Sequence, residues 1–220
     1  MRMALFGQGP LMEAVQAALT GHDLVGPFVT PQPTEVLTGT QARVGLSAGY
    51  RHKLTPREWA CFPGGILNLH TGYLPWNRGA YPNVWPILEG SPAGVTLHRV
   101  DDGWDTGPIL CQREVAVAPW DTAETLYEKL VAEGQRLVQF WAEDAEAYGI
   151  GAGVPQDPEA GSFHRKADFD RWKDAAQHLS GEQPDLIRDL RAASFPGYGL
   201  RYRQDGKLIE ATITMKEVAE

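Results

Sequence analysis

The chain has 220 residues, of which 43% are hydrophobic and 22% charged, and its formal net charge is -8. These values are ordinary for one large globular domain, or for one domain with a small appendage, and no apolar run is long enough to span a membrane. Proteins that bind a nucleic-acid backbone usually carry a basic face, so the acidic balance argues against nucleic acid. It leaves open a single phosphorylated small molecule as ligand.

The first half of the chain alternates between predicted strands and helices. Short apolar runs predict four strands, and helical spacing follows the first of them at residues 11–19. A further helix is expected to begin after Thr55, because Thr is a good N-cap and Pro56 suits the first helical position. This alternation predicts an α/β fold with an open, mostly parallel sheet. The four strands are expected at 3–6, 24–29, 44–48 and 66–70.

The second half continues with a helix near 84–89, strands at 94–100 and 109–117, and one long helix at 123–147. We expect one stripe of that long helix to pack into the core, comprising Leu126, Leu130, Leu137, Phe140 and Trp141. Glycine and proline then gather at 149–158 and predict a linker. The linker divides a core at 1–150 from a C-terminal subdomain at 151–220. That subdomain holds a helix near 184–193 and a β-hairpin turning at Asp205-Gly206.

The fourth strand ends in polar residues that could form a site. Asn68 and His70 are two positions apart, so their side chains project from the same face of the strand. Open α/β sheets bind ligands at the carboxyl ends of their strands. Asp105 lies in a glycine-flanked acidic loop between two later strands. Taken singly, each residue is explained better by structure than by catalysis: His70 as a strand cap, Asn68 as a loop contact and Asp105 as part of an acidic turn.

The ordered context of these residues indicates a function. Asn68-Leu-His70 is followed by Leu-Pro-Trp-Asn-Arg-Gly at 74–79, by Gly-Val-Thr-Leu-His at 94–98 and by Asp-Thr-Gly at 105–107. This series resembles the folate-dependent formyltransferase family. The resemblance implies a Rossmann-like fold, N10-formyltetrahydrofolate as formyl donor, and Asn68, His70 and Asp105 as catalytic residues. It also implies that the N-terminal half is shortened, with a strand–helix unit missing between Val29 and Val44.

The implied chemistry suits these residue types. An amine that attacks the formyl carbon generates an oxyanion, to which the amide of Asn68 and a protonated His70 can donate hydrogen bonds. A histidine is also suited to moving the proton that leaves the amine, and Asp105 beside it would stabilise the imidazolium. No metal is required, and no spacing of His, Cys or Asp supplies a metal site.

Binding residues follow from the same resemblance. Two loops are expected to hold the folate, one after the third strand and one before Asp105, with contacts from His52, Leu54, Asp102 and Gly103. The segment 73–85 looks most like the nucleotide-sugar N-formyltransferases, in which the acceptor is often a dTDP-linked 4-amino-4,6-dideoxy sugar. We therefore expect a role in deoxysugar biosynthesis and acceptor contacts from Trp76, Asn77, Arg78 and Tyr81.

Other acceptors stay open. Glycinamide ribonucleotide, or a peptide or siderophore intermediate, could supply the amine, and Gly7-x-Gly9 is half of a dinucleotide fingerprint that would fit another Rossmann nucleotide-binding protein. Methionyl-tRNA formyltransferases carry a further domain and basic surface, which this chain does not match. The resemblance also favours a homodimer through the hairpin, because exposed strand edges invite pairing.

The remaining sequence features point to an intracellular protein. The opening residues 1–10 contain too short an apolar run for a signal peptide. Cys61 and Cys111 form no disulfide framework, and we interpret them as buried thiols. We therefore expect the protein to be cytoplasmic, without a membrane partner.

Overall fold

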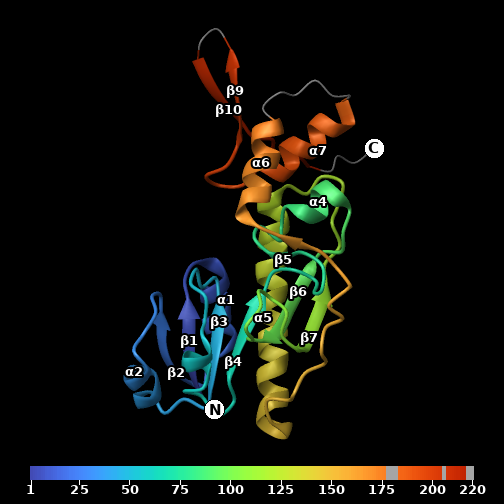
Figure 1. Ribbon diagram of the computed structural model, residues 1–220. Coiled ribbons are helices and arrows are strands. Elements are labelled where there is room, and N and C mark those ends of the chain that lie inside the picture. Colours follow the sequence, from blue (N-terminus) through green and yellow to red (C-terminus); the bar gives the residue numbers. More distant parts are fainter. Residues whose placement is uncertain (177–182, 205–206, 217–220) are drawn as a thin grey trace.

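A six-stranded sheet forms the centre of the computed structural model, which describes residues 1–176, 183–204 and 207–216 (Figure 1). The strand order is β2-β1-β3-β4-β6-β7. The first four strands are parallel to one another, β6 pairs antiparallel with β4, and β7 pairs antiparallel with β6. The predicted open, mostly parallel sheet is confirmed. Its strands are β1 (Arg2–Gly7), β2 (Asp23–Phe28), β3 (Val44–Ala48), β4 (Ile66–His70), β6 (Gly94–Arg99) and β7 (Ile109–Glu114).

Helices cover both faces of the sheet, as the alternating side chains of β1 require. Met3 and Leu5 point into one core, shared with α1 (Pro10–Ala18) and the long α5 (Ala123–Tyr148). Ala4 and Phe6 point into a second core on the opposite face. The short helix α2 (Thr34–Gly39) contributes Leu37 to that core, and the short helix α3 (Pro56–Trp59) packs against α2.

The connection between β2 and β3 is short. All of its residues are described, and they form only the six-residue helix α2 and no strand. The sheet ends at β2, which pairs with β1 on its one neighbouring side. This agrees with the expected shortening of the N-terminal half between Val29 and Val44.

Three smaller expectations are corrected. In α5 the predicted core stripe is buried except for Phe140, whose ring is 54% exposed and has the guanidinium of Arg113 above it, 5.9 Å from the ring centroid. Cys61 and Cys111 are half-buried rather than buried, and both are free thiols. The second hairpin strand, which the sequence pattern predicts over 208–215, ends at Ala211 instead.

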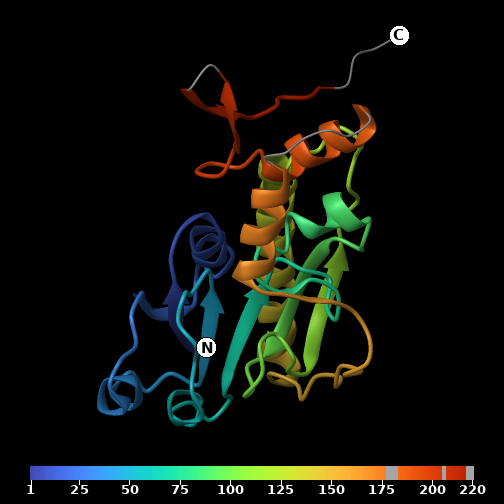
Figure 2. The same cartoon turned by 45° about the horizontal axis from the view of Figure 1, so that its top comes forward.

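The C-terminal part lies beyond the carboxyl ends of the parallel strands (Figures 1 and 2). The hairpin projects from the body, and its predicted turn at Asp205-Gly206 lies outside the described residues. No helix within the described ranges is long and apolar enough to cross a membrane. The remaining elements are β5 (Arg78–Gly79), α4 (Trp85–Glu89), β8 (Phe163–His164), α6 (Lys166–Ala176), α7 (Gln183–Ala193), β9 (Leu200–Gln204) and β10 (Lys207–Ala211).

The predicted linker runs back along the sheet after α5 and contacts it repeatedly (Figure 1). Val154 pairs with Ile109 of β7 through two backbone hydrogen bonds. The side chain of Arg99 donates to the carbonyl of Ala152. Further on, β8 forms a two-stranded parallel ladder with β5. The segment after residue 150 is thus packed against the elements before it.

Candidate active site

A cavity of about 1870 Å³ opens at the carboxyl ends of the parallel strands. Its walls come from the loops after β1, β3 and β4, from the loop at 101–105, from one face of α5, and from residues of the C-terminal part. Topology explains this position, because the carboxyl ends of β1, β3 and β4 lie at one edge of the sheet.

Asn68 and His70 enter the cavity from the end of β4. The pleat of the strand directs Leu67 and Leu69 into the core with α1 and α5, and therefore directs Asn68 and His70 to the opposite face. His70 is only 7% exposed. Its Nε2 donates a hydrogen bond to the carbonyl oxygen of Asn77 at 2.9 Å, and its Nδ1 faces Asp105.

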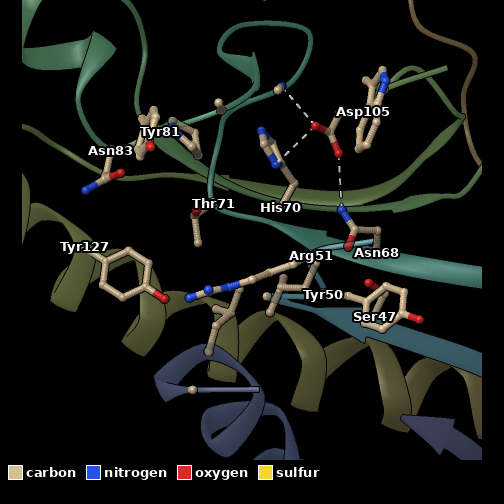
Figure 3. A pocket seen from close by; sticks show the side chains of 18 of the residues that line it. Ser47, Tyr50, Arg51, Asn68, His70, Thr71, Tyr81, Asn83, Asp105 and Tyr127 are labelled. Carbon is tan, nitrogen blue, oxygen red and sulfur yellow. Dashed lines mark hydrogen bonds and ion pairs between the residues drawn. The ribbon is translucent and has the colours of Figure 1, made fainter. Parts of the chain in front are cut away.

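Asp105 meets both residues from the other side (Figure 3). Its Oδ2 lies 3.6 Å from Nδ1 of His70 and accepts the backbone N–H of Gly79 at 3.0 Å. Its Oδ1 accepts from the amide of Asn68 at 3.3 Å. The backbone of Asp105 is left-handed, with φ at 55°, a conformation that Asp tolerates better than most residues. The structure thus brings together the three residues that the sequence singles out.

A second histidine completes this cluster, and the sequence analysis did not assign it to the site. Nε2 of His98 lies 3.4 Å from Oδ1 of Asp105 and 3.3 Å from the amide nitrogen of Asn68, while its Nδ1 donates to the carbonyl of Arg99 at 2.8 Å. In the antiparallel ladder of β4 and β6, His98 lies directly opposite Asn68. The only sequence signal was its place in the Gly-Val-Thr-Leu-His series, since the register of the two strands is not readable.

The charge state of Asp105 follows from these neighbours. Burial by itself would raise its pKa, but the charge of His70, the hydrogen bond and charge of His98 and the N–H of Gly79 together hold the pKa well below the usual range of an aspartate. Asp105 is therefore a carboxylate throughout the physiological pH range. A group so weakly basic is suited to be a counter-ion, which leaves proton transfer to an imidazole.

The predicted folate contacts are divided by the structure. His52, Leu54 and Gly103 line the cavity, with Leu54 buried and His52 exposed. Asp102 does not line it; its carbonyl oxygen accepts a hydrogen bond of 2.7 Å from Nζ of Lys53. That bond joins the loop after β3 to the acidic loop, so the two predicted folate loops lie together at one end of the cavity.

The predicted acceptor contacts are divided more sharply. Tyr81 lines the cavity, but Trp76, Asn77 and Arg78 do not. Asn77 is fully buried, and its amide donates to the carbonyl of Pro92 at 2.9 Å. Arg78 donates to backbone carbonyls of the C-terminal segment, and Trp76 is 40% exposed. Within this structure these three residues build the loop and present no side chain to the cavity.

The far wall of the cavity was not predicted. Glu124, Tyr127 and Glu128 face it from α5, and an aromatic group faces it from the C-terminal part. Phe195 and Tyr198 are stacked there, with ring centroids 4.9 Å apart. Burial, followed by the neighbouring tyrosines, raises the pKa of Tyr198 to about 12, so its phenol stays neutral. The sequence hint was limited to a cluster of aromatic residues around Pro196. Figure 3 shows Tyr127 and Arg51 pointing into the same space.

Comparison with known proteins places this chain in one class. Residues 29–139, half of the chain, match the formyl transferase family. The formyltransferase PseJ from Anoxybacillus kamchatkensis, solved with UDP-4,6-dideoxy-4-formamido-L-AltNAc and tetrahydrofolate, superimposes with a TM-score of 0.68 at 31% identity, over 87% of this chain and 98% of that one. The protein therefore belongs to the formyl transferase family.

Curated relatives come from two branches. A dTDP-4-amino-4,6-dideoxyglucose formyltransferase of Mycobacterium bovis is 34% identical over 60% of this chain and 58% of its own length. A methionyl-tRNA formyltransferase of Burkholderia vietnamiensis is also 34% identical, over 78% of this chain and 52% of its own length. The chain thus spans between half and three fifths of the length of these two relatives.

Proposed function

We propose that this protein transfers the formyl group of N10-formyltetrahydrofolate to the amine of a nucleotide-linked, dTDP-type 4-amino-4,6-dideoxy sugar. The observation that carries the proposal is the convergence of Asn68, His70 and Asp105 at the cavity edge. The donor and the acceptor are both substrates, so the site must accommodate two molecules, and a cavity of about 1870 Å³ is large enough for both.

Each residue has a role in this reaction. The acceptor nitrogen attacks the formyl carbon, the bond from that carbon to N10 breaks, and one proton passes from the acceptor nitrogen to N10. The Asn68 amide and an N–H of His70 are the expected donors to the oxyanion that develops, each typically worth about 3–4 kcal/mol of barrier. Their present partners, Asp105 and the Asn77 carbonyl, must then release those N–H groups. Asp105 stays ionised and stabilises the charged imidazole. The proton transfer is assigned to His70, because His70 is an imidazole that lines the cavity, whereas Asp105 is too weak a base.

The donor is expected at the end of the cavity that the loops at 49–54 and 101–105 enclose. The buried side chain of Leu54 offers an apolar contact for a flat ring, and the exposed backbone of Gly103 offers polar groups. His52 is adjacent to Tyr50, with ring centroids 5.3 Å apart. Asp102 contributes through its backbone bond to Lys53 rather than through a direct contact.

The opposite end of the cavity suits a nucleotide. Tyr81, Tyr127, Phe195 and Tyr198 give aromatic faces that can stack on a base or sugar ring. Arg165 and Lys166 lie at the same end and can pair with a diphosphate. A minimal amine such as a small peptide would leave this wall unused, which favours the nucleotide-sugar acceptor. The similarity to the dTDP-4-amino-4,6-dideoxyglucose formyltransferase and to the UDP-sugar complex of PseJ supports the same class.

The quaternary structure and location belong to this proposal as well. The hairpin of β9 and β10 projects from the body and leaves Leu208 59% exposed, which favours a homodimer formed through this element. The cytoplasm is the expected compartment. Light scattering on the purified protein tests the dimer; a Leu208→Asp variant should then be monomeric.

The decisive experiment is an acceptor panel with N10-formyltetrahydrofolate as donor, read by mass spectrometry of the formamide product. The panel contains dTDP- and UDP-linked 4-amino-4,6-dideoxy sugars, glycinamide ribonucleotide and methionyl-tRNA. The proposal expects turnover of at least one amino-sugar nucleotide and none of the other two. Turnover confined to methionyl-tRNA or to glycinamide ribonucleotide would refute it.

A further inference from the structure

The segment 154–164, here called the strap, touches the acidic loop that carries Asp105 and the loop 71–79 that follows His70. The chain leaves α5 at the far end of the sheet, and the strap then runs back past β7 to the cavity edge (Figure 1). It contacts the backbone carbonyl of Asp105 and the backbone N–H of Asn77, the residue whose carbonyl accepts from His70, although it lies more than eighty residues beyond the end of β4. Nothing in the proposed chemistry uses the strap directly, so its contacts need another explanation.

Gln156 holds the acidic loop. Its single amide nitrogen donates to the carbonyl of Asp105 at 2.9 Å and to the carbonyl of Gly107 at 2.8 Å. The first of these carbonyls belongs to the residue whose carboxylate faces His70. Because Asp105 has a left-handed backbone, which costs a non-glycine residue energy, an external clamp on its own carbonyl stabilises the conformation that aims the carboxylate.

Ser162 holds the other loop. Its Oγ accepts the backbone N–H of Asn77 at 2.9 Å, and the carbonyl of the same Asn77 accepts the hydrogen bond from Nε2 of His70. The adjoining ladder of β5 and β8 then fixes Gly79, whose N–H donates to Oδ2 of Asp105. A side chain at position 79 would place its Cβ 2.3 Å from the carbonyl oxygen of His164, so this close approach requires glycine.

We propose that the strap positions the catalytic pair, with Gln156 as the positioning residue for Asp105 and Ser162 as the one that fixes the Asn77 carbonyl against His70. This inference rests on the proposed formyl transfer for its effect on rate. The position of the Asp105 carboxylate, which the strap is inferred to fix, does not depend on the proposed function. Misplacement of a catalytic group by about 1 Å can lower turnover about a hundredfold.

The Gly79 amide gives a direct measurement of that geometry. Its N–H is held by the Asp105 carboxylate, whereas the neighbouring N–H groups of Arg78 and Ala80 donate to Ser162 and His164 of the strap backbone. In a Gln156→Leu variant, hydrogen exchange at Gly79 should be faster by at least tenfold, with exchange at Arg78 and Ala80 nearly unchanged. The control is Gln139→Leu on the exposed face of α5, which should alter none of the three.

Kinetics test the consequence. Gln156→Leu should lower kcat by about 10- to 100-fold with KM for both substrates within about twofold, since binding surfaces are left intact. Gln156→Glu should do at least as much, because a carboxylate would face two carbonyls. If Gln156→Leu melts below the assay temperature, Ser162→Ala, which removes a single hydroxyl, decides in its place, with the same expected fall in kcat.

Wild-type exchange at Gly79 together with wild-type kcat in these variants overturns the inference. Faster exchange without a fall in kcat overturns its catalytic part, and a rise in KM with unchanged kcat and exchange overturns it as well. A wild-type protein that formylates no acceptor refutes the proposed function instead, and the exchange experiment still decides where the strap holds Asp105.

Discussion

Two polar segments lie near the cavity edge, one at the end of β4 and one in the loop that follows it. Only the first directs its side chains into the cavity. At the end of β4, Asn68 and His70 point at Asp105 and into the cavity. A few residues later, Trp76, Asn77 and Arg78 offer the same kinds of groups but turn them into the protein or away from the cavity. The comparison shows that residue type alone does not predict a site residue. The position of the residue in a strand or a loop decides whether its side chain or its backbone contributes to the site.

The second region still matters to the first. The carbonyl of Asn77 accepts from His70, and the N–H of Gly79 donates to Asp105. One region therefore acts through side chains and the other through its backbone. Substitutions separate the two cases, because replacing a side chain removes the first kind of contribution and leaves most of the second.

The largest effect is expected at His70. His70→Ala should lower kcat by about a thousandfold or more, because it removes both a donor to the oxyanion and the group that moves the proton. Single-turnover formamide formation measures the rate, and calorimetric titration with tetrahydrofolate should show unchanged folate binding. Turnover within tenfold of the wild type would mean that the cluster around Asp105 is structural.

Asp105→Asn should lower kcat by about a hundredfold and should also change the pH dependence of stability. The folded-state pKa of Asp105 is held below its ordinary value of about 3.9, so the carboxylate contributes stability above that pH and loses the contribution as pH falls towards the folded-state value. Urea unfolding between pH 7 and pH 3 should therefore show a steeper loss of unfolding free energy for wild type than for Asp105→Asn. Parallel curves for the two proteins would contradict the ion-pair cluster with His70 and His98.

Substitution of Asn77 should lower the stability of the fold rather than the rate of catalysis. Asn77→Leu leaves the Pro92 carbonyl without its donor and puts a leucine at φ 59°, which together should cost about 3 kcal/mol, or about 6–12 °C in melting temperature. The kcat of the folded variant should stay within about tenfold, because the Asn77 carbonyl that His70 uses is retained. Asn77→Gly is a companion variant: it loses the same donor to the Pro92 carbonyl but adopts the left-handed backbone freely, so its melting temperature should fall less than that of Asn77→Leu. A large fall in the kcat of Asn77→Leu with an unchanged melting temperature would mean that the Asn77 side chain contacts the acceptor.

The parts of the molecule that the sequence predicted share one property: their side-chain directions follow from a regular element. The runs at 44–48 and 66–70 have the predicted strand bounds, because short, mostly apolar runs between polar and glycine-rich stretches are typical of buried central strands. The pleat then fixed Asn68 and His70 on one face. Asp105 was reached through the family resemblance, since a loop residue has no such periodicity.

What the sequence missed depends on long-range pairing. His98 joined the site because an antiparallel register placed it opposite Asn68, and no local pattern encodes that register. Gln156 lay in a glycine- and proline-rich stretch that indicated a linker, and its two bonds to the acidic loop cross about fifty residues of chain. Phe140 fell at the edge of a correctly predicted helical stripe, where Arg113 covers it instead of the core.

The smallest effect is expected at Trp76, which the sequence analysis paired with Tyr81 as an acceptor contact. Trp76 is 40% exposed and outside the cavity lining, whereas Tyr81 lines the cavity and packs on Phe169 with ring centroids 4.2 Å apart. Trp76→Ala should leave KM for the acceptor within about twofold and unfolding free energy within about 1 kcal/mol, as for an exposed site that loses some packing. Tyr81→Ala, its matched partner, should raise the acceptor KM about tenfold, in line with a stacking contact worth about 1–1.5 kcal/mol. Initial rates at varied amino-sugar nucleotide and saturating donor give both numbers. Equal KM values for the two variants would show that the cavity lining does not separate acceptor contacts from residues that only build the loop.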